Sequence, residues 1–365
     1  MFIADVIKFL ETFAPPALQE SYDNAGILTG NIAWECTGIL TTLDAIPAVI
    51  EEAIHKKCNL VVAHHPIIFK GLKKITGKNY VERSIIMAIK NDIAIYAIHT
   101  NLDNVKKGVN YKIAEKIGLQ DTQIMQPRDQ QLKKLVTFTP ITHAENLRGV
   151  MFAVGAGHLG KYSECSFSQE GTGTFMPQEG SDPFVGEIGK RHEEKEIKIE
   201  VIFPSHLQDK IIAAMIEAHP YEEVAYDIIN LGNYLTDVGS GIIGDLSVAI
   251  DEKEFLSLLK STFSLQMIRH TKLAGKPIKK VAICGGAGSF LLPVALSQKA
   301  DAYITADVKY HEFFDAEDRI LFIDIGHYES EQYTIDLLYD ILREKFINFA
   351  VRKTELNTNP VHYFL

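Results

Sequence analysis

Short apolar runs rich in β-branched residues alternate with segments of helical spacing in the first third of the chain. Such runs are typical of buried strands, whereas apolar residues three or four positions apart are typical of helices that pack on a sheet. The alternation therefore predicts an α/β fold. We expect strands at residues 38–43, 60–63 and 93–98 and helices at residues 1–8, 46–56, 84–91 and 109–117.

The same alternation returns near the end of the chain, after a stretch of different character. From about residue 130 to residue 231 the sequence is richer in glycine and in alternating polar and apolar positions, which indicates a separate α+β module. We expect a split α/β domain, residues 1–128 and 236–365, with an inserted domain at residues 129–235. We also expect the strands of the two halves to form one sheet. The elements predicted in these parts are strands at residues 135–139, 197–203, 225–229, 280–284, 302–305 and 320–325 and helices at residues 207–218 and 290–298.

Composition and charge narrow the class of protein. The chain has 365 residues, 46% of them hydrophobic and 23% charged, which is the balance of a well-packed soluble protein of about two domains. Its formal net charge of -10, with scattered lysines and arginines, argues against nucleic acid as the main partner. No apolar run reaches the ~18 residues of a membrane span, and the first residues lack the apolar core of a secretory signal, so we expect a cytoplasmic protein. Without a C-x-x-C pair, the cysteines are expected to be reduced and mostly buried: Cys36, Cys58, Cys165 and Cys284.

Two adjacent histidines end one of the predicted strands. His64 and His65 follow the apolar run at residues 60–63, and Pro66 ends the strand behind them. Strand ends are where α/β folds keep their sites. Because successive side chains on a strand point to opposite faces, the pair suits two metal ions side by side better than a single ion. The alternative is one core histidine and one solvated histidine.

A second group follows the strand predicted at residues 93–98. Asp103 could bridge two cations and neutralise part of their charge, or it could cap the next helix. His99, in the same segment, could orient a metal ligand or move protons.

A third group follows the strand predicted at residues 320–325. His327 and Glu331 are four residues apart, so a helix would place an imidazole and a carboxylate on one face, while Glu329 would point elsewhere. The alternative is an ordinary helix start, where the helix dipole favours acidic residues.

Three such groups at three strand ends of one sheet favour a shared metal centre. Three histidines and two carboxylates exceed the three protein ligands of a single catalytic zinc, and they fit a pair of ions about 3.5 to 4 Å apart. Nitrogen and oxygen ligands without a thiolate leave zinc, iron, manganese, cobalt and nickel open.

Further candidates lie near these groups in the sequence. The glycine loop at residues 285–289 could cradle a phosphate or form a tight turn between a strand and a helix. Asp307 and His311 are candidates for proton transfer, and Cys284 is a candidate nucleophile to which the sequence assigns no base. A group of lysines after the histidine pair could meet an anionic substrate or be solvated: Lys70, Lys73, Lys74 and Lys78.

The motifs that carry these groups resemble those of the Nif-three-like family, whose members are known as type-2 GTP cyclohydrolase I homologues. The matching motifs are His64-His65-Pro66, His99-Thr100-Asn101-Leu102-Asp103, Gly326-His327-Tyr328-Glu329-Ser330-Glu331, Tyr22-Asp23-Asn24-Ala25-Gly26 and Cys284-Gly285-Gly286-Ala287-Gly288-Ser289. The resemblance implies two divalent metal ions and a toroidal homohexamer. It also implies that the segment around residues 218–227 belongs to an inserted CutA-like or PII-like module of ferredoxin type, which binds a small regulator or assists assembly. The implied metal ligands are His64, His65, Asp103, His327 and Glu331.

We therefore expect a dinuclear metal-binding protein that acts as a hydrolase on a nucleotide-like small molecule. GTP ring opening follows from the family's name, and phosphoester hydrolysis is an equal chemical possibility, with His99 or His311 moving protons. The alternative is a non-enzymatic metal-binding protein with a regulatory or scaffold role.

Overall fold

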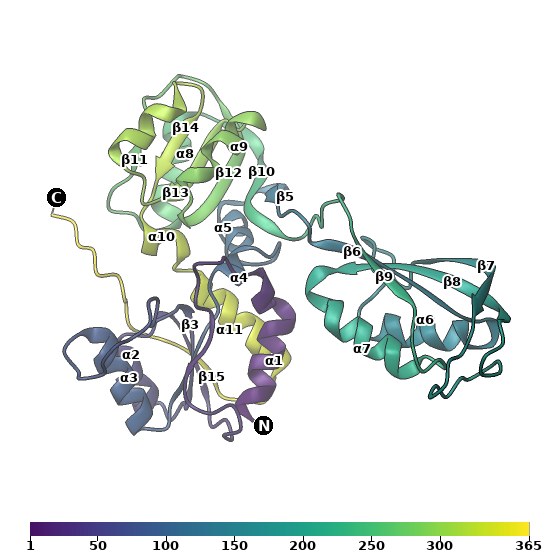
Figure 1. Ribbon diagram of the computed structural model, residues 1–365. Coiled ribbons are helices and arrows are strands. Elements are labelled where there is room, and N and C mark those ends of the chain that lie inside the picture. The colour runs from purple at the N-terminus through teal and green to yellow at the C-terminus, as the bar shows by residue number, and fades with distance from the viewer. Residues whose placement is uncertain (365) are drawn as a thin grey trace. The chain divides into compact units, whose positions relative to one another are not determined.

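The computed structural model describes residues 1–364, which form two compact units. Unit 1 consists of Met1–Pro127 and Thr236–Leu365, and unit 2 consists of Arg128–Leu235. The chain thus leaves unit 1 once and returns to it once (Figure 1). The roles predicted for the two parts, a metal-binding domain and an inserted regulatory module, stay predictions.

A five-stranded sheet forms one part of unit 1. Strand β3 lies between β2 and β4 and is parallel to both, so the carboxyl ends of these strands lie at one edge. In this register Asp44 lies beside His65. In spatial order the strands are β1 (Gly26–Thr29), β4 (Ala94–Ala97), β3 (Leu60–His65), β2 (Ile39–Asp44) and β15 (Val351–Lys353), and only β1 is antiparallel to its neighbour.

Helices cover both faces of this sheet (Figure 1). Leu40 and Val61 belong to the core under α2 (Pro47–His55) and α3 (Tyr80–Lys90). The next side chain along β2, Thr41, points to the opposite face, where its hydroxyl donates to the backbone of α11 (Thr334–Lys345). The local signals agree with these bounds, because Pro47 is at the first turn of α2 and Asn79 caps α3 by accepting from the Glu82 amide.

A six-stranded sheet forms the other part of unit 1. Its strands β12, β13 and β14 are parallel, and the remaining neighbours are antiparallel. In spatial order they are β11 (Arg269–His270), β14 (Leu321–Asp324), β13 (Ala302–Ala306), β12 (Ile278–Ala287), β10 (Gly239–Ile250) and β5 (Gln120–Pro127). The other helical segments of unit 1 are α1 (Ile3–Phe13), η1 (Pro16–Leu18), α4 (Thr100–Asp103), α5 (Val109–Ile117), α8 (Glu252–Thr262), η4 (Ser289–Leu291), α9 (Leu292–Ser297), η5 (Tyr310–Ala316) and α10 (His327–Glu331).

The predicted α/β class is confirmed, but the expectation of a single sheet is wrong. Strands β3 and β4 belong to the five-stranded sheet, whereas β14 belongs to the six-stranded one. The two halves of the sequence also exchange strands, because β15 pairs with β2 and β5 pairs with β10. An apolar run marks a strand without naming its neighbour, so the pattern could not separate one sheet from two.

Unit 2 has its own antiparallel sheet and its own core. The order along the chain is strand, helix, strand, strand, helix, strand, and Leu135, Ile199 and Phe203 pack under the two helices. The elements are β6 (Leu132–Pro140), η2 (Ile141–His143), α6 (Ala144–Ala153), β7 (Ser166–Phe175), β8 (His192–Pro204), η3 (Ser205–Leu207), α7 (Gln208–Ala218) and β9 (Tyr226–Asn230), with the spatial strand order β7, β8, β6, β9.

Among the described residues, none of the helices is both long enough and apolar enough to span a membrane.

Candidate metal centre

The first part of the site is the end of β3, where His64 is fully buried. Its Nδ1 lies 2.9 Å from the carbonyl oxygen of Ile98, which can only accept. The proton therefore sits on Nδ1, and the lone pair of Nε2 points into the site. This is the orientation in which a histidine can bind a metal ion.

His65 is held in the same manner by a carboxylate. Its Nδ1 donates to Oδ1 of Asp44 at 2.8 Å, and the second oxygen of Asp44 accepts from the hydroxyl of Thr358 at 2.6 Å. The rings of His64 and His65 are 5.0 Å apart between centroids. The strand thus presents two imidazoles to one region while each keeps its own partner.

The second part of the site is the short helix α10. It begins after Gly326, whose φ of 92° suits glycine, and it places His327 and Glu331 on one face. The Nδ1 of His327 donates to Asp307 at 2.7 Å, and its Nε2 lies 3.1 Å from Glu331 Oε2. Glu329 points elsewhere, as predicted, and accepts from the side-chain amide of Asn359.

Glu331 stands at the centre of the group. Its Oε2 lies 3.0 Å from Nε2 of His65, and its Oε1 lies 3.9 Å from Nε2 of His64. The carboxylate is almost completely buried. It therefore divides the site into two sides, with one oxygen facing each.

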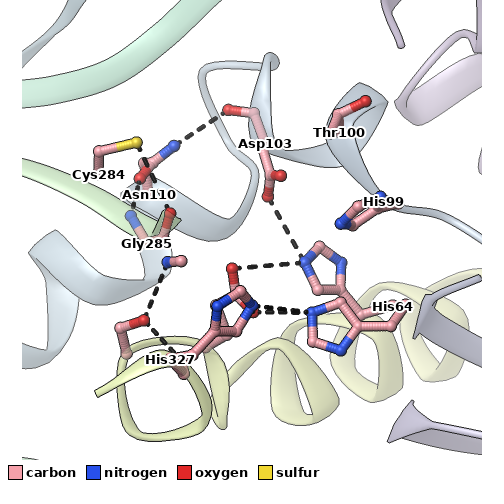
Figure 2. A network of polar contacts seen from close by, with 12 residues as sticks. His64, His99, Thr100, Asp103, Asn110, Cys284, Gly285 and His327 are labelled. Atoms are coloured by element: carbon pink, nitrogen blue, oxygen red, sulfur yellow. Dashed lines mark hydrogen bonds and ion pairs between the residues drawn. The ribbon is translucent and has the colours of Figure 1, made fainter. Parts of the chain in front are cut away.

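Asp103 completes the side that contains His64. In Figure 2 its carboxylate points toward the His64 ring, and its Oδ1 lies 3.6 Å from His64 Nε2. Both atoms are buried and lack a hydrogen-bond partner among the described residues. Two unsatisfied buried polar atoms that face one another are costly unless a further group binds between them.

A close approach of backbone to Glu331 explains one glycine of the predicted loop. Gly286 has a φ of 62°, and a Cβ atom at this position would lie 2.3 Å from Glu331 Oε1. Its amide donates to the hydroxyl of Ser330 at 3.0 Å. Only glycine fits beside the carboxylate without displacing it.

His99 lies at the rim of the site and is held by Asp23. Its Nδ1 donates to Asp23 Oδ1 at 2.8 Å, and its ring centroid is 5.2 Å from that of His64 and 5.4 Å from that of His65. Ligand atoms of these three histidines lie within 4.8 Å of one another, as do those of a second group that consists of His65, His327 and Glu331. Each group could hold a metal ion.

The electrostatics on the His65 side favour protonated imidazoles. Burial alone would lower the pKa of His65, but its hydrogen bonds to Asp44 and Glu331 outweigh burial and raise the pKa to about 10. Burial likewise opposes the charge of His327, yet Glu331 and Asp307 raise its pKa to about 9. The same two imidazoliums overcome burial at Glu331 and hold the pKa of its carboxyl well below the usual range. Protons occupy this side when no cation does.

On the other side the same forces favour neutral groups. Burial lowers the pKa of His64 to about 3, despite the attraction of Glu331. Burial, reinforced by the negative charge of Glu331, raises the pKa of Asp103 well above its usual range. The His64 side therefore lacks positive charge, although its imidazole and carboxyl groups are of the kinds that can bind a cation.

A pocket of about 410 Å³ opens beside the His65 side. Most charged groups in its wall are carboxylates, and Arg269 is paired with Asp324 at 3.0 Å. The segment that ends the described chain contributes Asn359 and Tyr363 to the wall. The charged lining residues are Asp44, Asp307, Asp324, Glu329 and Arg269, together with the protonated imidazoles of His65 and His327.

The structure brings together all five predicted metal ligands, whereas other candidates lie in different surroundings. His311 is exposed, and its ring packs near Tyr310 and Phe314, so its contacts lend proton transfer no support. Cys284 is buried, and burial raises the pKa of its thiol far above the usual range, which does not suit a nucleophile. The lysines at positions 70, 73, 74 and 78 are exposed.

The glycine loop does not form the alternative phosphate cradle. The amide of Gly285 donates to Asn110, that of Gly286 to Ser330 and that of Gly288 to Thr305. Because these donors are already used inside the protein, they are not available to an anion. The loop instead serves close packing beside Glu331.

Three aspartates orient the imidazoles. The sequence did not predict this role for any of them. Asp44 and Asp23 hold His65 and His99, and Asp307, which the sequence made a candidate for proton transfer, holds His327. A signal for Asp44 exists in the sequence, because it directly follows the strand predicted at residues 38–43. A carboxylate at the end of a neighbouring parallel strand is a candidate second partner for a ligand histidine.

Comparison with known proteins places these features in a family. A family model described as Duf34/NIF3, NGG1p interacting factor 3, matches residues 1–360. Proteins named GTP cyclohydrolase 1 type 2 homolog are 39% identical in Halalkalibacterium halodurans, over 97% of each chain, and 36% identical in Bacillus subtilis, over 97% of this chain and 96% of that one. The crystal structure of a Bacillus cereus protein related to NIF3 is 37% identical, with a TM-score of 0.87 and coverage of 100% of this chain and 99% of that chain. The resemblance seen in the motifs is thereby confirmed, and the chain belongs to the Duf34/NIF3 family.

Proposed function

We propose that the chain binds two divalent metal ions and uses them to hydrolyse a nucleotide-like small molecule. The observation that carries the proposal is the pair of orphaned atoms, His64 Nε2 and Asp103 Oδ1, which are buried 3.6 Å apart beside one oxygen of Glu331. A cation bound there would satisfy both atoms. The residues present therefore fit a metal ion, judged by their chemistry and their burial.

Each side of Glu331 offers a set of three ligands. His64, Asp103 and Oε1 of Glu331 would hold one ion. His65, His327 and Oε2 of Glu331 would hold the second, in the place where two imidazolium protons converge on the carboxylate in the metal-free protein. Three protein ligands per ion leave positions for water and substrate, as in catalytic sites. Because the donors are nitrogen and oxygen, zinc, iron, manganese, cobalt and nickel all remain candidates.

The side chains around the ions have distinct tasks. Bound metal ions would supply an activated water and an electrophilic contact to a carbon or phosphorus atom of the substrate. Asp44 and Asp307 keep His65 and His327 in the orientation that ligation needs. His99 would exchange a proton with the substrate through Nε2, because Asp23 holds its Nδ1 proton. The alternative role for His99 is that of a further ligand, grouped with His64 and His65.

The substrate class follows from the relatives and from the pocket. Relatives carry the name GTP cyclohydrolase 1 type 2 homolog, which suggests a nucleotide-like substrate. Four carboxylates line the 410 Å³ pocket and are nearly balanced by Arg269 and the imidazoliums of His65 and His327, so the metal-free pocket offers a nucleotide phosphate little net attraction. Bound metal ions would add the positive charge that such a substrate needs, and Arg269 offers one further positive group.

The test compares wild type with His64→Ala and, as a matched control, His55→Ala at an exposed position. Metal content is measured by mass spectrometry, and turnover is measured with GTP and with a phosphodiester. We expect two ions per chain and turnover in wild type and the control, and loss of both in His64→Ala. Two bound ions without turnover of any substrate class tested would favour the alternative, a metal-binding protein with a regulatory or scaffold role. Absence of bound metal would contradict both proposals.

We further propose that unit 2 is a ferredoxin-like module of the CutA or PII type and that the chain forms a homohexamer. The strand and helix order of unit 2 supports the first part, since it is the order of that motif. Light scattering of the purified chain tests the second part directly.

A further inference from the structure

Unit 2 contains a pocket of about 730 Å³ whose lining residues all belong to that unit. Phe138 and Lys198, paired across β6 and β8, point to the face of the sheet opposite the one that packs under α6 and α7. Residues from the segments 176–185 and 221–225 also line the pocket. The volume is in the range of sites for small organic ligands, which is roughly 300 to 1,000 Å³.

Aromatic rings form the walls of this pocket. The ring centroid of Tyr221 is 5.9 Å from that of Phe175 and 6.2 Å from that of Phe184, and Phe138 also lines the pocket. At this spacing the rings contact one another at interplanar angles of 58° and 51°, and Phe175, Phe184 and Tyr221 together form an aromatic part of the pocket wall. The faces of aromatic rings attract cations as well as apolar groups.

The charge of the pocket is negative. Four carboxylates and a single ammonium group line it. The ammonium group belongs to Lys198, and its charge is paired with Glu200 Oε1 at 2.6 Å. An anionic ligand is therefore disfavoured, and a cationic one is favoured. The lining carboxylates are Glu170, Glu196, Glu222 and Glu223.

Glu196 is the buried member of this group, with 8% of its surface exposed. Its Oε1 accepts from the hydroxyl of Tyr221 at 2.8 Å. Its Oε2 lies over Gly173 of β7, where a Cβ atom would lie 2.1 Å from it. The absence of a side chain at this position therefore makes room for the carboxylate. His219 in turn accepts from the Tyr221 amide through Nδ1 and donates to the Phe138 carbonyl through Nε2. The carboxylate is thus held in place by a chain of hydrogen bonds.

We propose that unit 2 binds a small organic cation in this pocket, a protonated amine with an apolar body. The amine would lie against Glu196, and the body would lie between Phe175, Phe184 and Tyr221. A metal ion fits less well, because no group of three metal-ligating side chains among the described residues includes Glu196. The proposal is independent of the metal centre, since no residue of unit 1 takes part in it.

The test uses the full chain and 2-phenylethylamine as the probe, with 2-phenylethanol as its neutral counterpart. Binding is measured by saturation-transfer NMR and calorimetry, with Glu196→Gln as the main variant and Glu193→Gln, exposed on the same strand outside the pocket, as the matched control. We expect the amine to bind with a Kd of about 1 mM or tighter and at least about tenfold more tightly than the alcohol. We expect Glu196→Gln to lower the affinity for the amine about tenfold and Glu193→Gln to leave this affinity unchanged.

A second variant keeps the test decisive if Glu196→Gln does not fold. Phe184 is half exposed, so Phe184→Ala removes a wall of the pocket at little cost to the core, and we expect amine affinity to fall roughly threefold to tenfold. Thermal unfolding of each variant confirms that unit 2 is folded. The proposal is overturned if the intact chain shows no saturable amine binding up to roughly 10 mM. It is also overturned if the chain binds the alcohol as tightly as the amine. A third contrary result would be unchanged amine affinity in both Phe184→Ala and a folded Glu196→Gln.

Discussion

The replacement Glu331→Gln tests whether one carboxylate serves two metal ions. The change keeps the shape of the side chain and removes its negative charge. In the present geometry Oε2 is 3.0 Å from His65 Nε2 and 3.1 Å from His327 Nε2, and Oε1 is 3.9 Å from His64 Nε2. A glutamine has one acceptor oxygen, so its amide nitrogen must face one of these two sides and oppose a cation there.

The expected loss of affinity can be bounded. Removal of a group that only orients a ligand typically lowers metal affinity by about 10-fold to 100-fold. Loss of a charged ligand should therefore lower the affinity for each of the two ions by at least about 100-fold. Asp103→Asn is the matched comparison, because Asp103 contacts only the His64 side. We expect Glu331→Gln to lose both ions and Asp103→Asn to lose one and keep the other.

The metal-free protein should also be less stable in Glu331→Gln. Breaking a buried ion pair by removing one partner costs about 3 to 5 kcal/mol, and the lower end applies here because the side chain of His327 is 39% exposed and screened by solvent. Urea unfolding in the presence of a chelator measures the free energy of unfolding. Calorimetric titration and mass spectrometry measure the ions. A Glu331→Gln protein that keeps two ions at wild-type affinity would refute the bridging assignment.

Two further predictions concern the same centre. The pKa values of His65 and His327, about 10 and 9, lie above the unfolded value, so their stabilisation of the metal-free protein is complete below pH 6.5 and is lost as the pH rises through 9 to 10. Since an ion on the His65 side must displace both protons, the logarithm of the affinity for that ion should rise by about two per pH unit between pH 6.5 and 9 in a chelator competition, and a slope of zero would contradict this. Gly286→Ala should displace Glu331 and lower metal occupancy, whereas Gly275→Ala, which has a similar φ of 71° and nothing within 4 Å, should leave it unchanged. Equal metal content in the two variants would show that the collision with Glu331 does not control metal binding.

The sequence predicted the site well where spacing alone determines geometry. A four-residue separation on a helix places His327 and Glu331 together, and α10 realises this arrangement. The strand that carries the histidine pair and the helix at residues 109–117 are likewise present. These features depend on local periodicity, which a single sequence contains.

Features that depend on pairing between distant segments could not be read in this way. The position of Asp44 at a strand end makes it a candidate, but its place beside His65 depends on the pairing of β2 with β3, and the contact of Asp23 with His99 depends on the arrangement of a loop. The separation of β14 from β3 into another sheet is of the same kind. The glycine loop was misleading for a related reason, since its amides meet side chains from distant parts of the chain.

The placement of the ligands has a consequence for the order of events during synthesis. His64, His65 and Asp103 precede unit 2, whereas His327 and Glu331 follow it, and both proposed ion sets include Glu331. A nascent chain that ends within or just after unit 2 can therefore complete neither set, so a chain that holds the proposed ions has been translated at least to the end of α10. A protease cut at residue 128 or 235 should, by contrast, leave the metal ions bound. The two halves of unit 1 stay paired without unit 2, because β15 is hydrogen-bonded to β2 and β5 is hydrogen-bonded to β10.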